Sequence, residues 1–301
     1  MEQRIRPLPI DPAALHGLSE KIVTSHHQNN YGGAVKRLNA IRAQLAETKF
    51  DTVPGFVLNG LKREELVAAN SMVLHELHFE SLGGDGETMA PPMAMALAAS
   101  FGSVARWKEE FVAMGKALGG GSGWVLLSFQ PRDGTLVNQW ASDHTQAAAG
   151  AVPILALDMY EHAYHMDFGA QAGLWVDTFM RNIDWDGVYR RYQQAVDGAT
   201  SHLGVDRAKA EGSLLLDVRR RGVYEAATEL LPGAQWRDPQ FVDAWAGAIE
   251  PGREVVVYCV YGHEVGRGTA LRLRANGVDA RFLEGGIDGW KSAGLPLEGK
   301  P

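Results

Sequence analysis

Two polar side chains suited to metal binding follow a short apolar stretch near the middle of the chain. Residues 154–157 read ILAL, which is typical of a buried strand, and Asp158 and then His162 come after it. A strand that ends here leaves its polar side chains directed toward a common point. One carboxylate and one imidazole are therefore available as ligands of a metal ion.

Further ligands would have to come from helices, and the chain contains ten histidines. His26 or His27 lies in one segment with helical spacing. His75 or His78 lies in a second such segment. Spacing alone does not choose within either pair, because a histidine on a helix is more often a surface or packing residue than a ligand. At this level a metal site is only suggested.

Cys259 is the single cysteine of the chain, so no internal disulfide can form. It follows the apolar run 255–258 and opens the loop CVYGHEVGR, after which helical spacing begins. Backbone N–H groups in such a loop, together with a helix N-terminus, lower the pKa of a thiol and hold an anionic or persulfide sulfur. The alternative is a buried, inert cysteine.

The elements that position these residues begin with two helices. Residues 19–50 show apolar side chains at helical spacing, with Ser19 as the N-cap and a bend possible near the glycine pair that follows residue 31. A second helical pattern covers residues 62–82 and stops at the GGDG sequence of residues 83–86. The pattern predicts an antiparallel helical hairpin.

A mixed region follows the hairpin. Residues 91–99 and 103–118 have helical spacing, and the first of these begins with a proline pair. Residues 124–129 and 135–140 are short β-rich runs joined by PRDG, a sequence typical of a hairpin turn, and 154–158 is a third strand. We expect a small antiparallel sheet with helices, and an α+β fold for this part.

The last part of the chain has a different pattern. Residues 193–209 are polar and small without a clear period, and we place a domain boundary there. Beyond it, the apolar runs 214–218, 255–258 and 280–283 alternate with helical stretches. Buried strands that alternate with helices predict a small α/β domain with a parallel sheet.

Composition limits the classes of function. Hydrophobic residues make up 46% of the 301 residues and charged residues 22%, which is the balance of a globular protein. The net charge is −7, and no basic cluster exceeds residues 219–221, so we expect neither nucleic acid nor an anionic membrane as a partner. Without a long apolar run or a targeting pattern, a cytoplasmic location is expected.

The region around the candidate carboxylate resembles a known family. Residues 158–164 read DMYEHAY, which closely resembles the DxWEHAY signature of the iron/manganese superoxide dismutases. Residues 98–103 (AASFGS) and 121–124 (GSGW) also resemble dismutase segments. The resemblance covers approximately residues 1–195.

The resemblance implies a complete ligand set. The first histidine ligand of the family falls on His26 and the second on His75, and Asp158 and His162 complete the site. Three imidazoles and one carboxylate suit iron or manganese, here one ion per chain, and no thiolate lies near enough in sequence to indicate zinc or copper. The implied reaction is the disproportionation of superoxide by a metal that alternates between +2 and +3. The ligands do not distinguish iron from manganese.

Residues around the ligands depart from the family pattern. The tyrosine that gates the substrate falls on Ala34, the nearby gate histidine on Asn30, and a tyrosine that bridges the family's dimer on His165. The tryptophan of the signature is Tyr160. We expect a rebuilt gate, with His78 or Tyr160 as candidate replacements and with consequences for the rate and its pH dependence.

Two further roles follow from the resemblance. The glutamine that holds the metal's solvent ligand in many members falls on His144, for which the alternative is a surface loop histidine. Glu161 follows the acidic residue that reaches the partner subunit's ligand histidine. A homodimer through Glu161 and His162 is therefore expected. The alternative for Glu161 is a local salt bridge.

The segments around Cys259 resemble a second family. Residues 216–219 (LDVR), 231–234 (LPGA) and 285–290 (GGIDGW) resemble three rhodanese segments in the correct order around the cysteine loop. The loop itself departs from the usual pattern, because Glu264 and Val265 stand where Arg-Ser or Arg-Thr is common. A carboxylate there would repel thiosulfate, although Arg267 and His263 could compensate.

Together the two resemblances divide the chain into four parts. Residues 1–90 form the helical hairpin of a dismutase and 91–195 its α/β part. Residues 196–207 are a linker, and 208–301 form a rhodanese-like α/β domain.

Three hypotheses for function follow. The first is a superoxide dismutase with a sulfur-handling companion domain. The second is a sulfurtransferase that uses Cys259, with the dismutase-like half a metal-binding dimerisation scaffold of weak activity. The third is a non-catalytic redox sensor that uses the metal and Cys259 together.

Overall fold

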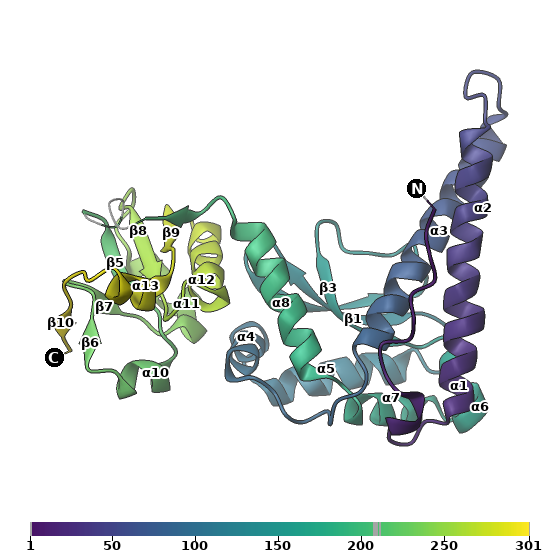
Figure 1. The fold of residues 1–301 in the computed structure, drawn as a ribbon, viewed down its shortest axis with the longest axis horizontal. Helices are drawn as coiled ribbons and strands as arrows, with labels where there is room; N and C mark the ends of the chain where they lie inside the picture. The colour runs from purple at the N-terminus through teal and green to yellow at the C-terminus, as the bar shows by residue number, and fades with distance from the viewer. Residues whose placement is uncertain (1, 207–209, 211, 301) are drawn as a thin grey trace.

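The computed structural model describes residues 2–206, 210 and 212–300 of the chain. It begins in a helical hairpin, continues through a three-stranded sheet flanked by helices, and ends in a separate small sheet with its own helices (Figure 1). The N-terminal segment lies along the hairpin, and the C-terminal end lies at the opposite end of the molecule. The expected α+β half followed by a parallel-sheet α/β half is confirmed.

The predicted helix over residues 19–50 is present, with an irregularity in its first half. After a short turn, η1 (Pro12–Ala14), the helix consists of α1 (Glu20–Ser25), a π-helical segment η2 (His26–Tyr31) and α2 (Gly32–Ala46). The Oγ of Ser19 accepts a hydrogen bond from the Ile22 N–H at 3.2 Å, as an N-cap does. The irregularity therefore precedes the glycine pair. It begins at His26, and π-helical turns are frequent at functional sites.

The second helix of the hairpin is α3 (Gly55–Glu80), which is longer than predicted and packs antiparallel against α2. Leu38 and Ile41 of α2 form a buried apolar cluster with Ala68 of α3. The small Ala68 side chain lets the two helices approach closely. This packing holds His26 and His75, on different helices, in fixed relative positions.

The predicted three-stranded antiparallel sheet is present, in the order β2-β1-β3. Its strands are β1 (Trp124–Gln130), β2 (Thr135–Ala141) and β3 (Val152–Asp158). Trp124 is paired with Asp158 at the end of β3. The register therefore places a buried tryptophan beside the carboxylate of the candidate site.

Helices cover the sheet of the first half. The two predicted after the hairpin are confirmed, and further helices occur after β3. The helices are α4 (Pro91–Phe101), α5 (Val104–Ala117), η3 (Glu161–Ala163), α6 (His165–Phe168), α7 (Ala172–Arg181) and α8 (Trp185–Thr200). An aromatic core fills the space between them: Phe111 of α5 stacks on Phe179 of α7, and Trp107 meets Trp185 edge to face.

The second half contains the predicted parallel sheet, with the strand order β4-β9-β8-β5-β7 and every pair parallel. Its strands are β4 (Gly204–Val205), β5 (Leu214–Asp217), β7 (Gln235–Trp236), β8 (Val255–Tyr258) and β9 (Ala280–Leu283). A separate antiparallel pair consists of β6 (Glu229–Leu230) and β10 (Glu298–Gly299). The helices are α10 (Arg221–Ala226), η4 (Pro239–Phe241), α11 (Val242–Trp245), η5 (Ala246–Ala248), α12 (Glu264–Ala275) and α13 (Gly286–Ser292).

The expectation of a linker over residues 196–207 was wrong for most of that segment. Helix α8 continues to Thr200, and Gly204–Val205 form β4, which pairs with β9 of the parallel sheet. Val196 and Thr200, four residues apart on α8, are both fully buried, so this end of the helix is held by packing even though residues 197–200 are small or polar. Residue 207 and the expected start of the second domain at 208 lie outside the described residues.

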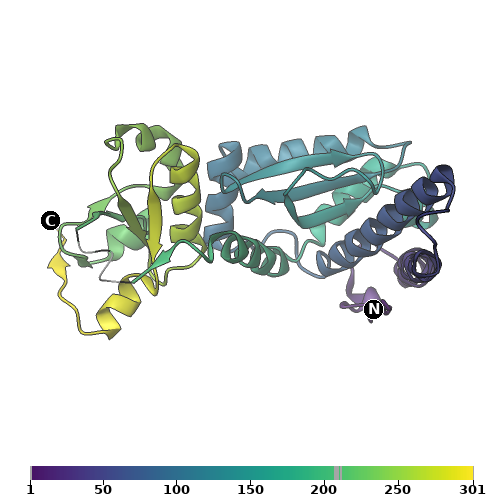
Figure 2. The same cartoon turned by 90° about the horizontal axis from the view of Figure 1, so that it is seen from above.

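The two halves share one apolar core. The same buried cluster contains Tyr192 and Val196 of α8 together with Leu216 of β5 and Leu271 of α12. In the view from above, α12 lies next to α4 and α8 (Figure 2). The guanidinium of Arg272 donates to the carbonyl oxygen of Ala99 in α4 at 3.1 Å. The halves are thus packed together directly and not only joined by the chain.

None of the helices among the described residues is both long and apolar enough to cross a membrane.

We expect the substitution Gly123→Ala to lower the free energy of unfolding by about 2 to 4 kcal/mol. The φ angle of Gly123 is +142°, and an added Cβ would lie 2.1 Å from the carbonyl oxygen of Ala141. The matched control is Gly121→Ala, whose added Cβ would have the Leu118 oxygen as its nearest neighbour at 3.5 Å. Urea denaturation measures both variants, and similar stabilities would contradict this account of the turn before β1.

Candidate metal centre

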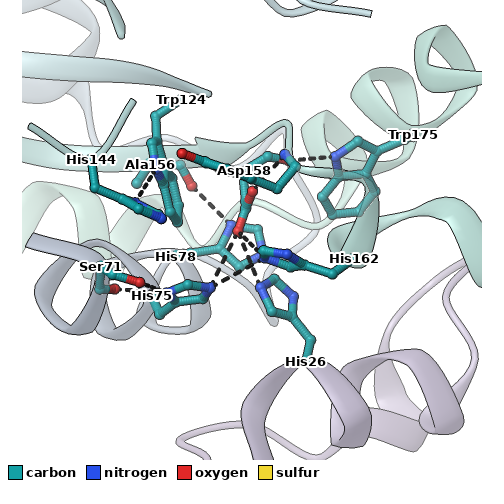
Figure 3. A network of polar contacts seen from close by, with 11 residues as sticks. His26, Ser71, His75, His78, Trp124, His144, Ala156, Asp158, His162 and Trp175 are labelled. Carbon is teal, nitrogen blue, oxygen red and sulfur yellow. Dashed lines mark hydrogen bonds and ion pairs between the residues drawn. The ribbon is translucent and has the colours of Figure 1, made fainter. Parts of the chain in front are cut away.

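Four side chains from four elements converge on one point (Figure 3). His26 opens η2, His75 lies in α3, Asp158 ends β3 and His162 lies in η3, and their ligand atoms all lie within 4.8 Å of one another. The Oδ2 of Asp158 is 3.1 Å from the Nε2 of His26 and 3.2 Å from the Nε2 of His162. The Nε2 of His75 is 3.5 Å from the same oxygen.

The end of β3 fixes the carboxylate. The Oδ1 of Asp158 accepts a hydrogen bond from the Tyr160 N–H at 2.8 Å, which turns the chain away from the strand and leaves Oδ2 for the histidines. The Nε1 of Trp175 donates to the carbonyl oxygen of Asp158 at 2.7 Å. The short helix η3 that follows brings His162, four residues later, back beside the carboxylate.

The hairpin fixes the other two imidazoles. The Nδ1 of His75 donates to the carbonyl oxygen of Ser71, one helical turn earlier, at 2.6 Å. With its proton on Nδ1, the ring offers the lone pair of Nε2 to the centre of the cluster, which is the tautomer a metal ligand needs. The side chains of His26 and His75 are almost fully buried, whereas that of His162 is 26% exposed. The cluster is therefore closest to solvent at His162.

The charges of the four groups fit a cation. Burial lowers the pKa of His26 and lowers that of His75 further, so both imidazoles are neutral. Burial acts to raise the pKa of Asp158, but the neighbouring His162 and His26 outweigh it and hold the carboxyl pKa well below its usual range. Neutral imidazole nitrogens and one ionised carboxylate are the donors that iron and manganese accept, and a bound cation would offset the buried negative charge.

The two alternatives that spacing left open lie outside the cluster. His27 is half-buried, and its Nε2 is 2.9 Å from the carbonyl oxygen of Arg6. His78 is buried next to the site, but its Nδ1 donates to the Ala156 carbonyl at 3.0 Å and its ring stacks on Phe179. The geometry therefore favours His26 over His27, and His75 over His78. Metal binding by the chosen pair remains a prediction.

His144 and Tyr160 form a stacked layer beside the ligands. The Nε1 of Trp124 donates to the Nδ1 of His144 at 2.9 Å. The His144 ring lies parallel to that of Tyr160, with centroids 4.7 Å apart, and Tyr160 in turn stacks on His162 at 5.4 Å. Both predicted residues thus adjoin the site, although neither belongs to the group of four.

The positions where the family has its gate carry no group that joins the cluster. These positions are Ala34, buried in α2, Asn30 in η2, and His165, exposed at the start of α6. A buried hydroxyl nearby belongs instead to Tyr31, which donates to Glu76 at 2.8 Å and accepts from the Arg6 N–H at 2.9 Å. The sequence offered no signal for Tyr31, because its partners are distant in the chain.

Ser71 and Trp175 were also not anticipated. Ser71 could have been found, because the carbonyl four residues before a helical histidine is its natural local partner. Trp175 could not, since nothing in its own segment indicates that it reaches back to Asp158. These two residues orient the ligands and do not belong to the cluster.

Cys259 lies in the second half, after β8, and the structure does not bring it to the metal cluster, which lies among the hairpin and β3 (Figure 1). The thiol is only 5% exposed. Burial raises its pKa, and hydrogen bonds from the backbone of Gly266, His263 and neighbouring residues act in the opposite direction. The pKa is raised overall, so the backbone N–H groups of the loop offset only part of the effect of burial, and the thiol itself donates to the His263 carbonyl oxygen at 4.0 Å.

Fold and site define a class: a cluster of three histidines and one aspartate, suited to a metal ion, on a helical hairpin and antiparallel sheet, followed by an α/β domain with a thiol loop. The model of the iron/manganese superoxide dismutase C-terminal domain matches residues 89–191, and that of the rhodanese-like domain matches residues 204–293.

Relatives identify the first half more closely. The superoxide dismutase [Fe] of Cupriavidus metallidurans is 61% identical over 196 residues, which cover 65% of this chain and 99% of that protein. Superoxide dismutase [Mn] 1 of Halobacterium salinarum is 35% identical, covering 65% of this chain and 98% of that protein. The superoxide dismutase [Fe] of Aquifex pyrophilus is 30% identical, covering 62% and 90%. The chain belongs to the iron/manganese superoxide dismutase family and carries a rhodanese-like domain.

We expect the metal-free protein to lose stability as the pH falls from about 6.5 to about 4. Burial lowers the pKa of His78 to about 4, against 6.5 for a free histidine. Between these values the unfolded chain binds the additional proton, so the free energy of unfolding falls by up to about 1.4 kcal/mol per pH unit for each such histidine. Urea denaturation across this range should show a smaller slope for His78→Phe, and an unchanged slope would contradict the assignment.

Proposed function

We propose that His26, His75, Asp158 and His162 bind one ion of iron or manganese per chain and that this half of the protein disproportionates superoxide. The observation that carries the proposal is the convergence of these four donor atoms within 4.8 Å. Relatives that are named superoxide dismutases, including one at 61% identity, support it. They do not favour the hypothesis in which this half is only a scaffold.

The chain's own residues would prepare the site. When bound, the metal supplies the one-electron oxidation and reduction that turn two superoxide molecules and two protons into dioxygen and hydrogen peroxide. Ser71 holds the His75 tautomer, and Trp175 holds the end of β3. The His75 ring in α3 and the Asp158 carboxylate at the end of β3 are thereby held in place before a metal binds, as preorganised electrostatics require.

Substrate access and proton supply follow from exposure. The side of the cluster at His162 is the least buried, so superoxide would approach there. The stacked rings of Tyr160 and His144 adjoin this side. We assign Tyr160 and His144 as the residues that donate hydrogen bonds or protons near the metal. They would replace the gate residues of the family, which this chain lacks.

Glu161 supports the proposal of a homodimer. It lies between Tyr160 and His162, its side chain is exposed, and the family resemblance places an acidic residue here against the ligand histidine of the partner subunit. An exposed carboxylate beside a partly exposed ligand is available for such a contact. The two sites of a symmetric pair would then be linked through Glu161 and His162.

We also propose that Cys259 carries sulfur in the rhodanese-like half. The N–H groups of the loop around its sulfur support this role. The chemistry requires a reduced thiol, and a chain with one cysteine is typical of a reducing compartment, which supports a cytoplasmic location.

We expect His26→Ala to lose its stoichiometric metal and to reduce superoxide consumption at least 100-fold, because a ligand atom disappears from the cluster. The adjacent His27→Ala is the matched control, since His27 is the same residue type on the same helical segment and lies outside the cluster. Elemental analysis and a superoxide-consumption assay measure both variants. Full metal content and activity in His26→Ala would show that the ligand set is wrong.

We expect the wild-type protein to sediment as a dimer and Glu161→Ala to dissociate at least ten-fold more readily, because a charge-assisted contact across the interface is lost. Analytical ultracentrifugation over a concentration series measures the dissociation. The control is Glu47→Ala, an exposed acidic residue at the end of α2. A monomeric wild type, or equal dissociation constants for both variants, would contradict the proposed interface.

A further inference from the structure

The carboxylate of Glu264 belongs to the thiol loop but is bound by the other half of the protein. Glu264 is the first residue of α12 and is only 5% exposed. The hydroxyl of Tyr189, in α8, donates to its Oε1 at 2.7 Å. The Nε2 of Gln193, also in α8, donates to its Oε2 at 3.1 Å. Both carboxylate oxygens therefore have donors from the dismutase half.

These contacts belong to a continuous stripe on α8. Tyr189, Gln193 and Asp197 are spaced by four residues, so they share one face of the helix, and this helix packs against α12 (Figure 1). Asp197 forms an ion pair with the Nε of Arg267 at 3.3 Å. The same nitrogen donates to the Gly262 carbonyl, inside the thiol loop, at 2.8 Å. The stripe thus contacts the loop through Glu264 and through Arg267.

A pocket of about 190 Å³ lies at the thiol, between the two halves. Pro92 and Tyr189 contribute to it from the dismutase half. From the rhodanese-like half, its walls include Arg219, Arg220, Val223 and residues 259–261 and 263–265. Its volume accommodates a small molecule and excludes a folded partner.

The charges in this pocket favour a small anion. The charge of Arg219 is paired with that of Asp217: the Nε of Arg219 donates to the Oδ1 of Asp217 at 3.0 Å and to its Oδ2 at 2.9 Å. Within the part of the chain that the structure describes, the guanidinium of Arg220 has no hydrogen-bond or ion-pair partner, so its positive charge is available to a ligand in the pocket. The negative charge of Glu264 is satisfied by its two donors on α8. An uncompensated Glu264 would instead repel an anion near Cys259.

We propose that Tyr189 and Gln193 of the dismutase half complete the thiol site, by fixing and compensating Glu264 so that Cys259 accepts sulfur from a small anionic sulfane compound such as thiosulfate. They are positioning residues, because they act through Glu264. The inference rests on the proposed sulfur-carrying role of Cys259. It removes the objection that a carboxylate in the loop excludes such donors.

The sulfur transfer consists of two balanced steps. The Cys259 thiolate attacks the outer sulfur of thiosulfate, the new S–S bond forms, and the bond to the sulfonate sulfur breaks, so a persulfide anion remains and sulfite leaves. An acceptor nucleophile, cyanide in the assay, then takes the outer sulfur as thiocyanate and returns the thiolate. No other oxidant or reductant is consumed.

The first test measures thiosulfate:cyanide transfer by the full-length protein. We expect Tyr189→Phe to raise the KM for thiosulfate about five-fold with little change in kcat, because the uncompensated carboxylate repels the anion. The double variant Tyr189→Phe/Glu264→Gln should recover the wild-type KM. Tyr192→Phe, a matched change on the same helix at a hydroxyl that does not bind Glu264, should leave KM unchanged. A KM unaffected by Tyr189→Phe would overturn the proposal.

The second test does not depend on turnover. Cys259 is the only cysteine, so alkylation reports on it alone, with the thiolate displacing iodide from either reagent. We expect Tyr189→Phe to lower the ratio of the iodoacetate rate to the iodoacetamide rate several-fold, and Glu264→Gln in the same chain to restore it. An unchanged ratio would overturn the role of Tyr189. If the alkylation ratios change as expected but the wild-type protein transfers no sulfur from thiosulfate to cyanide, only the sulfur-carrying role of Cys259 is overturned. Circular dichroism confirms that each variant is folded.

Discussion

The structure of the first half depends on one buried interaction, the meeting of the Asp158 carboxylate with three imidazoles. A fully buried carboxylate is strongly destabilised unless charges and hydrogen-bond donors compensate it. His162 comes from the same turn, but His26 and His75 come from different helices of the hairpin. The hairpin must therefore dock on the end of β3 for the carboxylate to be stable. A bound cation at the centre would offset the remaining charge, so metal binding would stabilise the packing of the hairpin on β3.

Helix α8 connects this centre to the thiol loop. On one side Arg191 donates to the Ile154 carbonyl of β3 at 2.9 Å and to the Glu80 carbonyl at the end of α3 at 3.1 Å, so it ties the strand of the site to the hairpin. On another side Tyr189 binds Glu264 of α12. One helix thus supports the scaffold of the metal centre and the loop around Cys259. The shared apolar core explains why residues of the first half can contact the thiol loop of the second.

Regular patterns in the sequence made most of the helices and strands predictable. Features that depend on contacts between distant segments of the chain could not be predicted in this way. The helical spacing and the short apolar runs located the hairpin, the antiparallel sheet and the strands around Cys259. Choosing His26 over His27 required resemblance to a family, because adjacent histidines look alike in a helical pattern. The donors to Glu264 could not be predicted, since Tyr189 and Gln193 lie in a segment that was partly assigned to the interdomain region. Small, polar residues concealed a helix there that tertiary packing stabilises.

The central claim is that the four converging groups hold a redox-active metal that consumes superoxide. Elemental analysis of the protein as isolated, combined with a superoxide-consumption assay on the same sample, tests it most directly. The structure predicts one iron or manganese per chain and an activity that rises in proportion to the metal content across partly loaded samples. Stoichiometric iron or manganese without superoxide consumption, or activity that is independent of metal content, would contradict it.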